Sequence, residues 1–186
     1  GTHNILRLVA PHGGCLKNNS STDTGAFKIA LPVLWTSTML RMTIRIYEYT
    51  TNESFDVHCG GYNYTNLWYN VFAYITGSPI VGRNFTVRFG HDGSNACIWI
   101  GETSSTWSYP QVFVTEFQAG YNSFAIDTWN DNWNVTITTS FDTVQHTVTN
   151  TQIGKWVDNN VVLHAGNYST YANLITNNNQ LTNGAG

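Results

Sequence analysis

Residues 39–49 read Met-Leu-Arg-Met-Thr-Ile-Arg-Ile-Tyr-Glu-Tyr, and they decide the fold class. From Leu40 to Ile46 every second residue is apolar, and the polar residues Arg41, Thr43 and Arg45 alternate with them. A period of two residues is typical of a β-strand that buries one face and exposes the other. The segment therefore predicts an antiparallel strand at the border of a core.

The same period recurs on both sides of this segment. Shorter candidate strands are Ile5–Val9, Phe27–Leu31, Phe55–Cys59, Val71–Tyr74, Val87–Phe89, Ala96–Ile100, Val112–Phe117, Val135–Thr139 and Val144–Val148. Asp92-Gly93 between two of them is a strong hairpin signal. No helix is predicted before residue 160. The pattern predicts an all-β fold, an antiparallel β-sandwich of jelly-roll-like type, over residues 1–150.

Charge narrows the range of partners. The 186 residues include 8 Lys or Arg and 11 Asp or Glu, which gives a formal net charge of −3. The basic residues are scattered, whereas nucleic-acid binding needs clustered Lys and Arg to neutralise phosphates, so no nucleic-acid partner is expected. No stretch approaches the ~18 apolar residues of a membrane span, and no signal-peptide pattern opens the chain. We expect no membrane insertion.

The cysteines and histidines do not form a metal-binding pattern. Cys15, Cys59 and Cys97 include no Cys-x-x-Cys pair, which argues against a zinc ribbon. Cys59 and Cys97 lie in candidate strands, where a free cysteine is usually a small buried apolar group. Neighbours such as His58-Cys59 and His91-Asp92 point to opposite faces of a strand. We predict no bound metal and no organic cofactor.

The composition changes near residue 150. Residues 161–186 are low in charge, rich in Asn and poor in aromatic side chains. Such a segment has too little apolar surface to fold alone. We expect residues 151–186 to be either a disordered end or a segment that folds only against other chains.

Two motifs in this segment resemble elements of known fibre proteins. Val162–Asn167 (Val-Leu-His-Ala-Gly-Asn) resembles the HAGN box of bacteriophage tail fibres and their relatives, and Leu181–Gly186 resembles the LTNGAGY element that often follows it, here cut short. The preceding body resembles a module of phage and giant-virus fibres and of phage-derived bacterial fibre proteins. Its matching segments are Gly60–Tyr64, Arg88–Gly93, Ile98–Thr103 and Trp107–Pro110.

The resemblance implies a homotrimer. Residues 1–150 would be its β-sandwich fibre-tip or adhesin domain, and residues 151–186 a fibre-like trimerisation segment with the HAGN box. It also implies a longer parent protein and an extracellular location, on a virion fibre or a bacterial cell-surface fibre. It supplies no binding residues. As an alternative to a protein without metal, the His164 side chains of three chains could face the trimer axis and bind an ion there.

Catalysis has only weak support in the sequence. Glycoside hydrolysis needs two carboxylates roughly 5–10 Å apart, one of them with a raised pKa. The spacing singles out no pair among the candidates Asp92, Glu102, Glu116, Asp127 and Asp131. Asp92 is interpreted as a turn residue and Glu102 as a charge at a strand end. Gly-x-Ser-x-Gly is absent, and Cys97 lacks the electropositive setting that activates a thiolate. We therefore expect no enzyme activity.

Aromatic residues and neutral polar groups gather in residues 62–69, 106–109 and 129–133. Flat rings cover the apolar face of a sugar, and Asn, Asp, Ser and Thr bind its hydroxyl groups. The scarcity of charges favours a neutral glycan. The candidate ligand-binding residues are Trp68, Tyr69, Trp107, Trp129 and Trp133, with Asp131 as their polar partner. The alternative is that these rings close the ends of the sandwich, as Trp99 is expected to do.

These observations predict a receptor-binding adhesin module of a trimeric fibre, which recognises a glycan on a host or prey cell surface without covalent chemistry. The alternative is a structural spacer or trimerisation module without a ligand of its own. A small glycan-cleaving enzyme is a third hypothesis, which the carboxylates do not favour.

Overall fold

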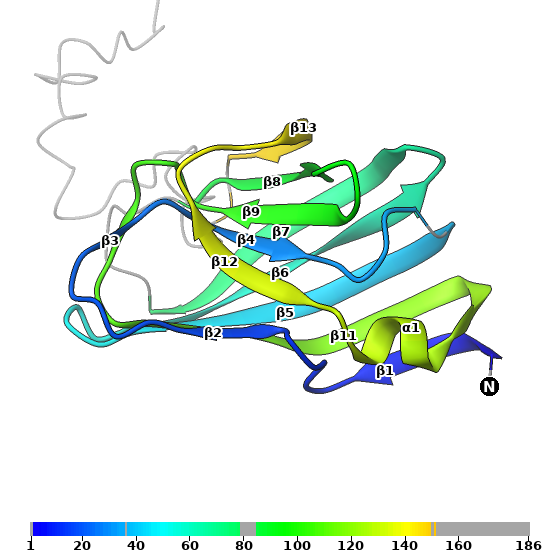
Figure 1. Cartoon of the computed structure of the whole chain (residues 1–186), viewed down its shortest axis with the longest axis horizontal. Coiled ribbons are helices and arrows are strands. Elements are labelled where there is room, and N and C mark those ends of the chain that lie inside the picture. The colour runs from blue at the N-terminus through cyan, green and yellow to red at the C-terminus, as the bar shows by residue number, and fades with distance from the viewer. Residues whose placement is uncertain (1, 36, 79–84, 150, 152–186) are drawn as a thin grey trace, which may run out of the picture. The chain divides into compact units, whose positions relative to one another are not determined.

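A computed structural model describes residues 2–35, 37–78, 85–149 and 151. In residues 2–5 and 121–126 only the backbone is described. The described chain is almost entirely antiparallel β-structure, so the predicted all-β class is confirmed (Figure 1). Thr151 is buried; its carbonyl oxygen accepts from the backbone N–H of Ile75 at 2.7 Å, and its hydroxyl donates to the carbonyl oxygen of Phe85. The rest of the predicted trimerisation segment, with its HAGN box, lies outside the described residues.

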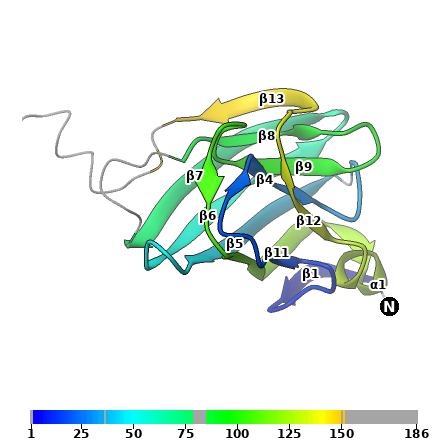
Figure 2. The ribbon, with the colours of Figure 1, turned by 60° about the vertical axis from the view of Figure 1, so that its left-hand side comes forward.

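The strands form two main sheets, seen from two directions in Figure 1 and Figure 2. The larger sheet has the order β1-β11-β5-β6-β7, with β2 also paired to β11. Its strands are β1 (Thr2–Leu8), β2 (Cys15–Lys17), β5 (Thr38–Glu48), β6 (Glu53–Tyr64), β7 (Leu67–Ser78) and β11 (Pro110–Ala125).

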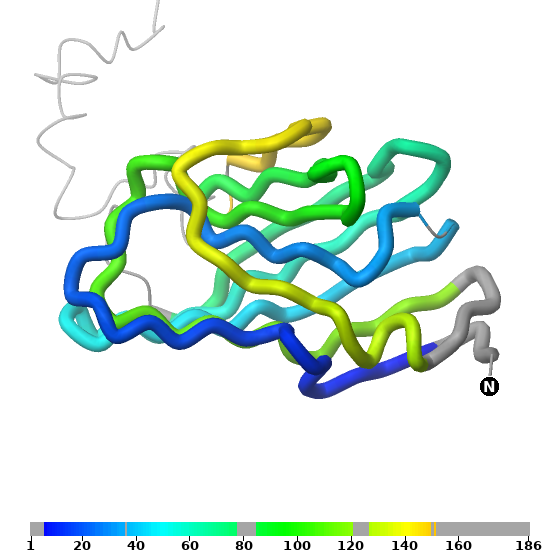
Figure 3. Tube along the Cα trace, viewed as in Figure 1, coloured from blue at the N-terminus to red at the C-terminus, as the bar shows by residue number. Residues whose placement is uncertain are grey.

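The smaller sheet has the order β12-β4-β9-β8-β13. Its strands are β4 (Ala26–Ala30), β8 (Val87–His91), β9 (Ala96–Ile100), β12 (Asn134–Thr138) and β13 (Thr143–Val148). The two-residue strands β3 (Asp23–Thr24) and β10 (Thr106–Trp107) pair with each other. Figure 3 traces the chain as it passes from β4 in the smaller sheet to β5 in the larger one.

One hydrophobic core takes side chains from both sheets. The predicted apolar side of β5, from Leu40 to Ile46, is buried, and so is all of β9. Ile44 and Ile46 belong to the same cluster as Ile98 and Ile100. The two sheets are therefore sandwich-like layers around a shared interior, and their buried apolar area supplies the main driving force for folding.

The hairpin of β6 and β7 is longer than the sequence predicted. Thr65 and Asn66 have φ angles of 40° and 67°, and Tyr64 pairs directly with Leu67. Two successive residues with positive φ make the tight turn that matches the twist of a hairpin. Residues 62–69 are thus strand and turn, and their prediction as a loop is wrong.

A short helix was also missed. α1 (Ile126–Asn130) follows β11, and the indole N–H of Trp133 donates to the carbonyl oxygen of Trp129 at its end, at 2.6 Å. One helical turn is too short to show a 3.6-residue period, which is why the sequence pattern did not reveal it. Residues 129–133 therefore form the end of a helix and the turn after it.

Four of the candidate ligand-binding rings are core residues, which agrees with the alternative of packing inside the sandwich. They are Trp68, Trp107, Trp129 and Trp133. The burial of Trp99, which the sequence predicted, is confirmed.

Strand geometry explains why Trp68 is buried and Tyr69 is not. Trp68 pairs with the buried Asn63 across the hairpin, and successive strand residues point to opposite faces. Trp68 therefore points into the core and Tyr69 points outward. The indole N–H of Trp68 donates to the carbonyl oxygen of Gly90 at 3.0 Å, which ties the larger sheet to the smaller one.

The other three rings pack against phenylalanines. Trp107 lies 4.1 Å from Phe27, measured between ring centroids. Trp129 and Trp133 lie 5.0 Å and 4.9 Å from Phe117. Rings held this way bury large apolar areas, so core packing explains them without a ligand.

The predicted turn at Asp92 is confirmed. Its carboxylate accepts backbone N–H bonds from Ser94 and Asn95 and lies 2.9 Å from the Lys28 ammonium. Partial burial opposes ionisation of Asp92, but the Lys28 hydrogen bond and the two backbone bonds outweigh it and lower the pKa to about 2.

The cysteines are free thiols, as expected of an odd and widely spaced set. Cys59 and Cys97 are buried, and burial raises the pKa of each thiol to about 12. Both are therefore protonated apolar groups at neutral pH, as their positions in strands predicted.

Replacing Trp68 tests this assignment to the core. Trp68→Ala should lower the free energy of unfolding by about 3–5 kcal/mol, because it leaves a cavity and removes the partner of a buried carbonyl. Tyr69→Ala, at the exposed neighbour, should change it by about 0.5 kcal/mol or less. Urea denaturation measures both variants. Equal effects at the two positions would contradict the core assignment.

Candidate functional site

The outer face of the larger sheet carries a row of residues in register around Arg41. Arg41 on β5 pairs with Gln118 on β11 and with Gly60 on β6, and Gly60 pairs with Phe72 on β7. Paired residues point to the same face of a sheet. Since the residues on either side of Arg41 are buried, Arg41 and its row point away from the core.

Two β-bulges flank this row. Between the pairs Tyr62–Tyr69 and Gly60–Phe72, β7 has one residue more than β6, and Asn70 there has a φ of 47°. Next to Gln118, β11 likewise has one residue more than β5, and Glu116 has a φ of 51°. Bulges redirect side chains and are frequent beside functional sites. Asn adopts a positive φ readily, whereas Glu seldom does, so the bulge at Glu116 stores local strain of the kind that is frequent at functional sites.

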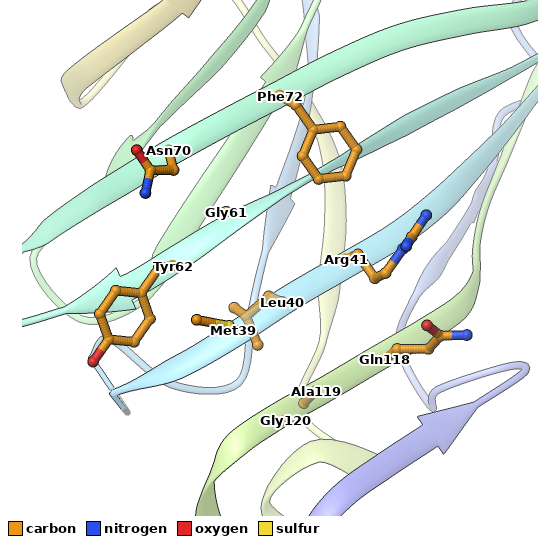
Figure 4. A pocket seen from close by; sticks show the side chains of 10 residues that line it. All are labelled: Met39, Leu40, Arg41, Gly61, Tyr62, Asn70, Phe72, Gln118, Ala119 and Gly120. Atoms are coloured by element: carbon orange, nitrogen blue, oxygen red, sulfur yellow. The ribbon is translucent and has the colours of Figure 1, made fainter.

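A pocket of about 390 Å³ opens beside this row, and we call it the Arg41 pocket. Figure 4 shows its side chains from β5, β6, β7 and β11: Met39 lies near Tyr62, and Arg41 lies beside Phe72 with its guanidinium directed away from Tyr62. Its lining residues are Met39, Leu40, Arg41, Gly61, Tyr62, Asn70, Phe72, Gln118, Ala119 and Gly120. Rings, a thioether, two amides and a guanidinium thus border one space.

Arg41 differs from the other arginines in the described part of the chain. Arg7, Arg45 and Arg88 each hold a carboxylate, at 2.9 Å or less, of Glu116, Asp56 and Glu102 respectively. Among the described residues, Arg41 has no acid partner. A guanidinium binds carboxylates and phosphates in a forked geometry, so an unpaired one in a pocket is suited to an anionic group.

A second hollow of about 270 Å³ continues from the Arg41 pocket along β5. It shares Arg41, Phe72 and Gln118 with that pocket. Its other lining residues are Met42, Thr43, His58 and Glu116, and the carboxylate of Glu116 is held by Arg7. The two ring nitrogens of His58 are hydrogen-bonded to the hydroxyls of Thr43 and Thr76, at 3.1 and 2.8 Å. This imidazole is therefore held in place, whereas Arg41 has no carboxylate partner in the part of the chain that the structure describes.

The structure separates the predicted site residues that remain exposed. Tyr69 is exposed on β7 and its ring lies 6.2 Å from that of Tyr62, which lines the Arg41 pocket. Asp131 follows α1, which packs against β1 at the opposite edge of the larger sheet. Asp131 forms an ion pair with His12 at 2.6 Å. Asp131 and Tyr69 therefore do not share one site.

Sequence reasoning missed Arg41, Tyr62, Phe72, Asn70 and Gln118. Two signals were present. The alternation of residues 39–49 places Arg41 outward, and glycines inside a strand pattern suggest a bulge or a close backbone approach. What the sequence did not reveal is which strands lie beside β5, because that depends on the topology of the whole sheet.

Four of the five candidate acids for catalysis are engaged in ion pairs: Asp92, Glu102, Glu116 and Asp131. Burial opposes ionisation of Glu102, but hydrogen bonds from Thr86 and Arg88 lower its pKa overall. The His12 hydrogen bond lowers the pKa of Asp131. Neither group has the raised pKa of a general acid. No group of three or more His, Cys, Asp or Glu among the described residues is arranged to hold a metal ion.

Comparisons with protein family models, curated proteins and solved structures found no match. In the part of the chain that the structure describes, no helix has the length and apolar character needed to cross a membrane.

Replacing Gly60 tests how closely β5, β6 and the Phe72 ring approach one another in this row. A Cβ at Gly60 would overlap the carbonyl oxygen of Leu40 and lie 3.0 Å from the Phe72 ring, so Gly60→Ala should cost about 1–3 kcal/mol of stability. Gly93→Ala is the control, because a Cβ there meets nothing within 4 Å and only its positive φ is penalised. Thermal unfolding compares them. A smaller loss at Gly60 than at Gly93 would contradict the close approach of these strands.

Proposed function

We propose that this chain is the receptor-binding module of a homotrimeric extracellular fibre, and that the Arg41 pocket binds a cell-surface glycan that carries an acidic group. The observation that carries the proposal is Arg41, which has no acid partner among the described residues and lines a pocket bordered by aromatic rings and amides. The binding is non-covalent, and the module has no catalytic role and needs no cofactor.

The chemistry of the pocket matches the parts of a sugar acid. Tyr62 and Phe72 offer flat apolar surface to the C–H face of a pyranose ring. The amides of Asn70 and Gln118 both donate and accept, as sugar hydroxyls require. Arg41 supplies a cation for a carboxylate or sulfate. The low overall charge favoured a neutral glycan, but the unpaired guanidinium favours an acidic one.

A shallow pocket of this kind gives modest affinity, and trimer formation would compensate for it. Three copies on one fibre convert later binding events into intramolecular ones, which raises avidity without new contacts. The β-sandwich of residues 1–150 would present the pocket, and residues 151–186 would join three chains. The fibre role rests on the resemblance of Val162–Asn167 to the HAGN box.

Arg41→Gln tests the pocket. Titration with digalacturonate and with the corresponding neutral disaccharide should show preference for the acidic sugar in the unaltered chain. Loss of a charged hydrogen bond of about 1.5–3 kcal/mol predicts at least tenfold weaker digalacturonate binding by Arg41→Gln. Arg45→Gln is the matched control, because it changes the charge equally on the same strand while its guanidinium is already held by Asp56.

Equal binding of the acidic and neutral disaccharides would contradict the role of Arg41. Unchanged digalacturonate binding by Arg41→Gln would show that the site lies elsewhere. If the chain binds no glycan on cells or in solution, the alternative of a structural spacer or trimerisation module is favoured instead.

The oligomeric state is a separate prediction. Light scattering should give three times the chain mass of 20.8 kDa, because residues 152–186 need other copies to bury their apolar groups. A chain shortened after Thr151, which keeps the buried Thr151 contacts, should give the mass of one chain. A full chain that stays monomeric at high concentration would contradict the proposed trimer.

A further inference from the structure

Another hollow on the same sheet face, separate from the two at Arg41, is lined by tyrosines. It has a volume of about 330 Å³ and lies at the far end of β5 from the Arg41 pocket. Tyr47, Tyr49 and Tyr109 are 37, 63 and 39% exposed, and the rings of Tyr49 and Tyr109 meet edge to face with centroids 6.0 Å apart. We call this hollow the tyrosine pocket; Lys17, Asn18 and Gln111 also line it.

The tyrosine pocket is held by the backbone around it. Tyr109 has a φ of 48°, and its backbone N–H donates to the carbonyl oxygen of Ser20 at 2.7 Å. The backbone N–H of Asn18 donates to the carbonyl oxygen of Pro110 at 3.0 Å. A tyrosine kept in the strained left-handed region, with its ring exposed, is costly for stability alone and points to a binding role.

The Arg41 pocket and the tyrosine pocket are also distinguished by their positively charged side chains. Six Lys and Arg side chains lie in the described part of the chain. Four of them hold carboxylates: Arg7, Lys28, Arg45 and Arg88. The two that hold none, among the described residues, are Arg41 and Lys17. One lines the Arg41 pocket and the other lines the tyrosine pocket.

Four separate hollows lie along β5 between these two cations, and only the first two of them share lining residues. Every outward residue of the strand from Met39 to Tyr47 lines at least one of these hollows: Met39, Arg41, Thr43, Arg45 and Tyr47. Lys17 lies beside Gln111, and Gln111 lies beside Tyr47, in one register row. Arg41 and Tyr47 are six residues apart, which is about 20 Å along a strand. That distance is much longer than one sugar ring.

We propose that the tyrosine pocket is a second saccharide subsite, and that the ligand is an extended acidic polysaccharide lying along β5 with acid groups at Arg41 and Lys17. This inference rests on the proposed glycan binding at Arg41. The two unpaired cations complement a chain with repeated acid groups. The tyrosine rings and the amides of Asn18 and Gln111 fit a sugar ring and its hydroxyls.

Chain length separates this inference from the proposed function. The probes are digalacturonate, which is too short to reach both pockets, and octagalacturonate, which is long enough. The unaltered chain should bind the octasaccharide at least tenfold more tightly than the disaccharide. Tyr49→Ala and Lys17→Gln should each remove most of this gain and leave disaccharide binding unchanged, whereas Arg41→Gln should weaken both probes.

Leu67→Ala is the control, because Leu67 is also a large exposed side chain on this sheet but lines none of the four hollows. Arg41-dependent disaccharide binding with octasaccharide affinity unaffected by Tyr49→Ala and Lys17→Gln would overturn the second subsite and leave the proposed function standing. Binding of neither probe would overturn both. If Tyr49→Ala changes the mass of the assembly and not the binding of glycan, the tyrosine pocket is a contact between copies of the chain.

Discussion

Along β5 the side chains of Leu40, Ile44 and Ile46 are buried in the core shared with the smaller sheet, and this burial orients the rest of the strand. A slip of one residue would move the apolar side chains into solvent and the arginines into the core, at a cost of many kcal/mol. Because β5 is third in the order β1-β11-β5-β6-β7, its register also fixes its neighbours. The outward positions follow from this constraint.

A regular sheet face would be evenly covered by side chains, and departures from regularity create the hollows. Gly60 has no side chain, so the Phe72 ring can lie over it. The bulges at Asn70 and Glu116 add one residue on each side of the Arg41 row. Both features interrupt the regular hydrogen bonding between strands only locally. They leave the inward side chains in place, so the core keeps its packing.

Local alternation predicted the fold class and the inward side of β5, because a two-residue period is written directly in the sequence. It did not predict the longer hairpin, whose turn depends on positive φ at Thr65 and Asn66. It also did not separate Trp68 from Tyr69. Both look alike as aromatic residues near a turn, and only the cross-strand partner decides which one is buried. Arg41 was visible as an outward residue, but its neighbours come from distant segments.

Charge is scarce in this chain, which makes the distribution of ion pairs informative. With 11 acidic and 8 basic side chains, an acid partner within reach of a given cation is not guaranteed by chance, yet Lys28 holds two carboxylates. An unpaired cation on a face rich in rings therefore contrasts with the arrangement elsewhere. Stability does not require Arg41 or Lys17 to lie in hollows, since exposed charges contribute little to it. Their placement agrees with the glycan binding that we propose for this face.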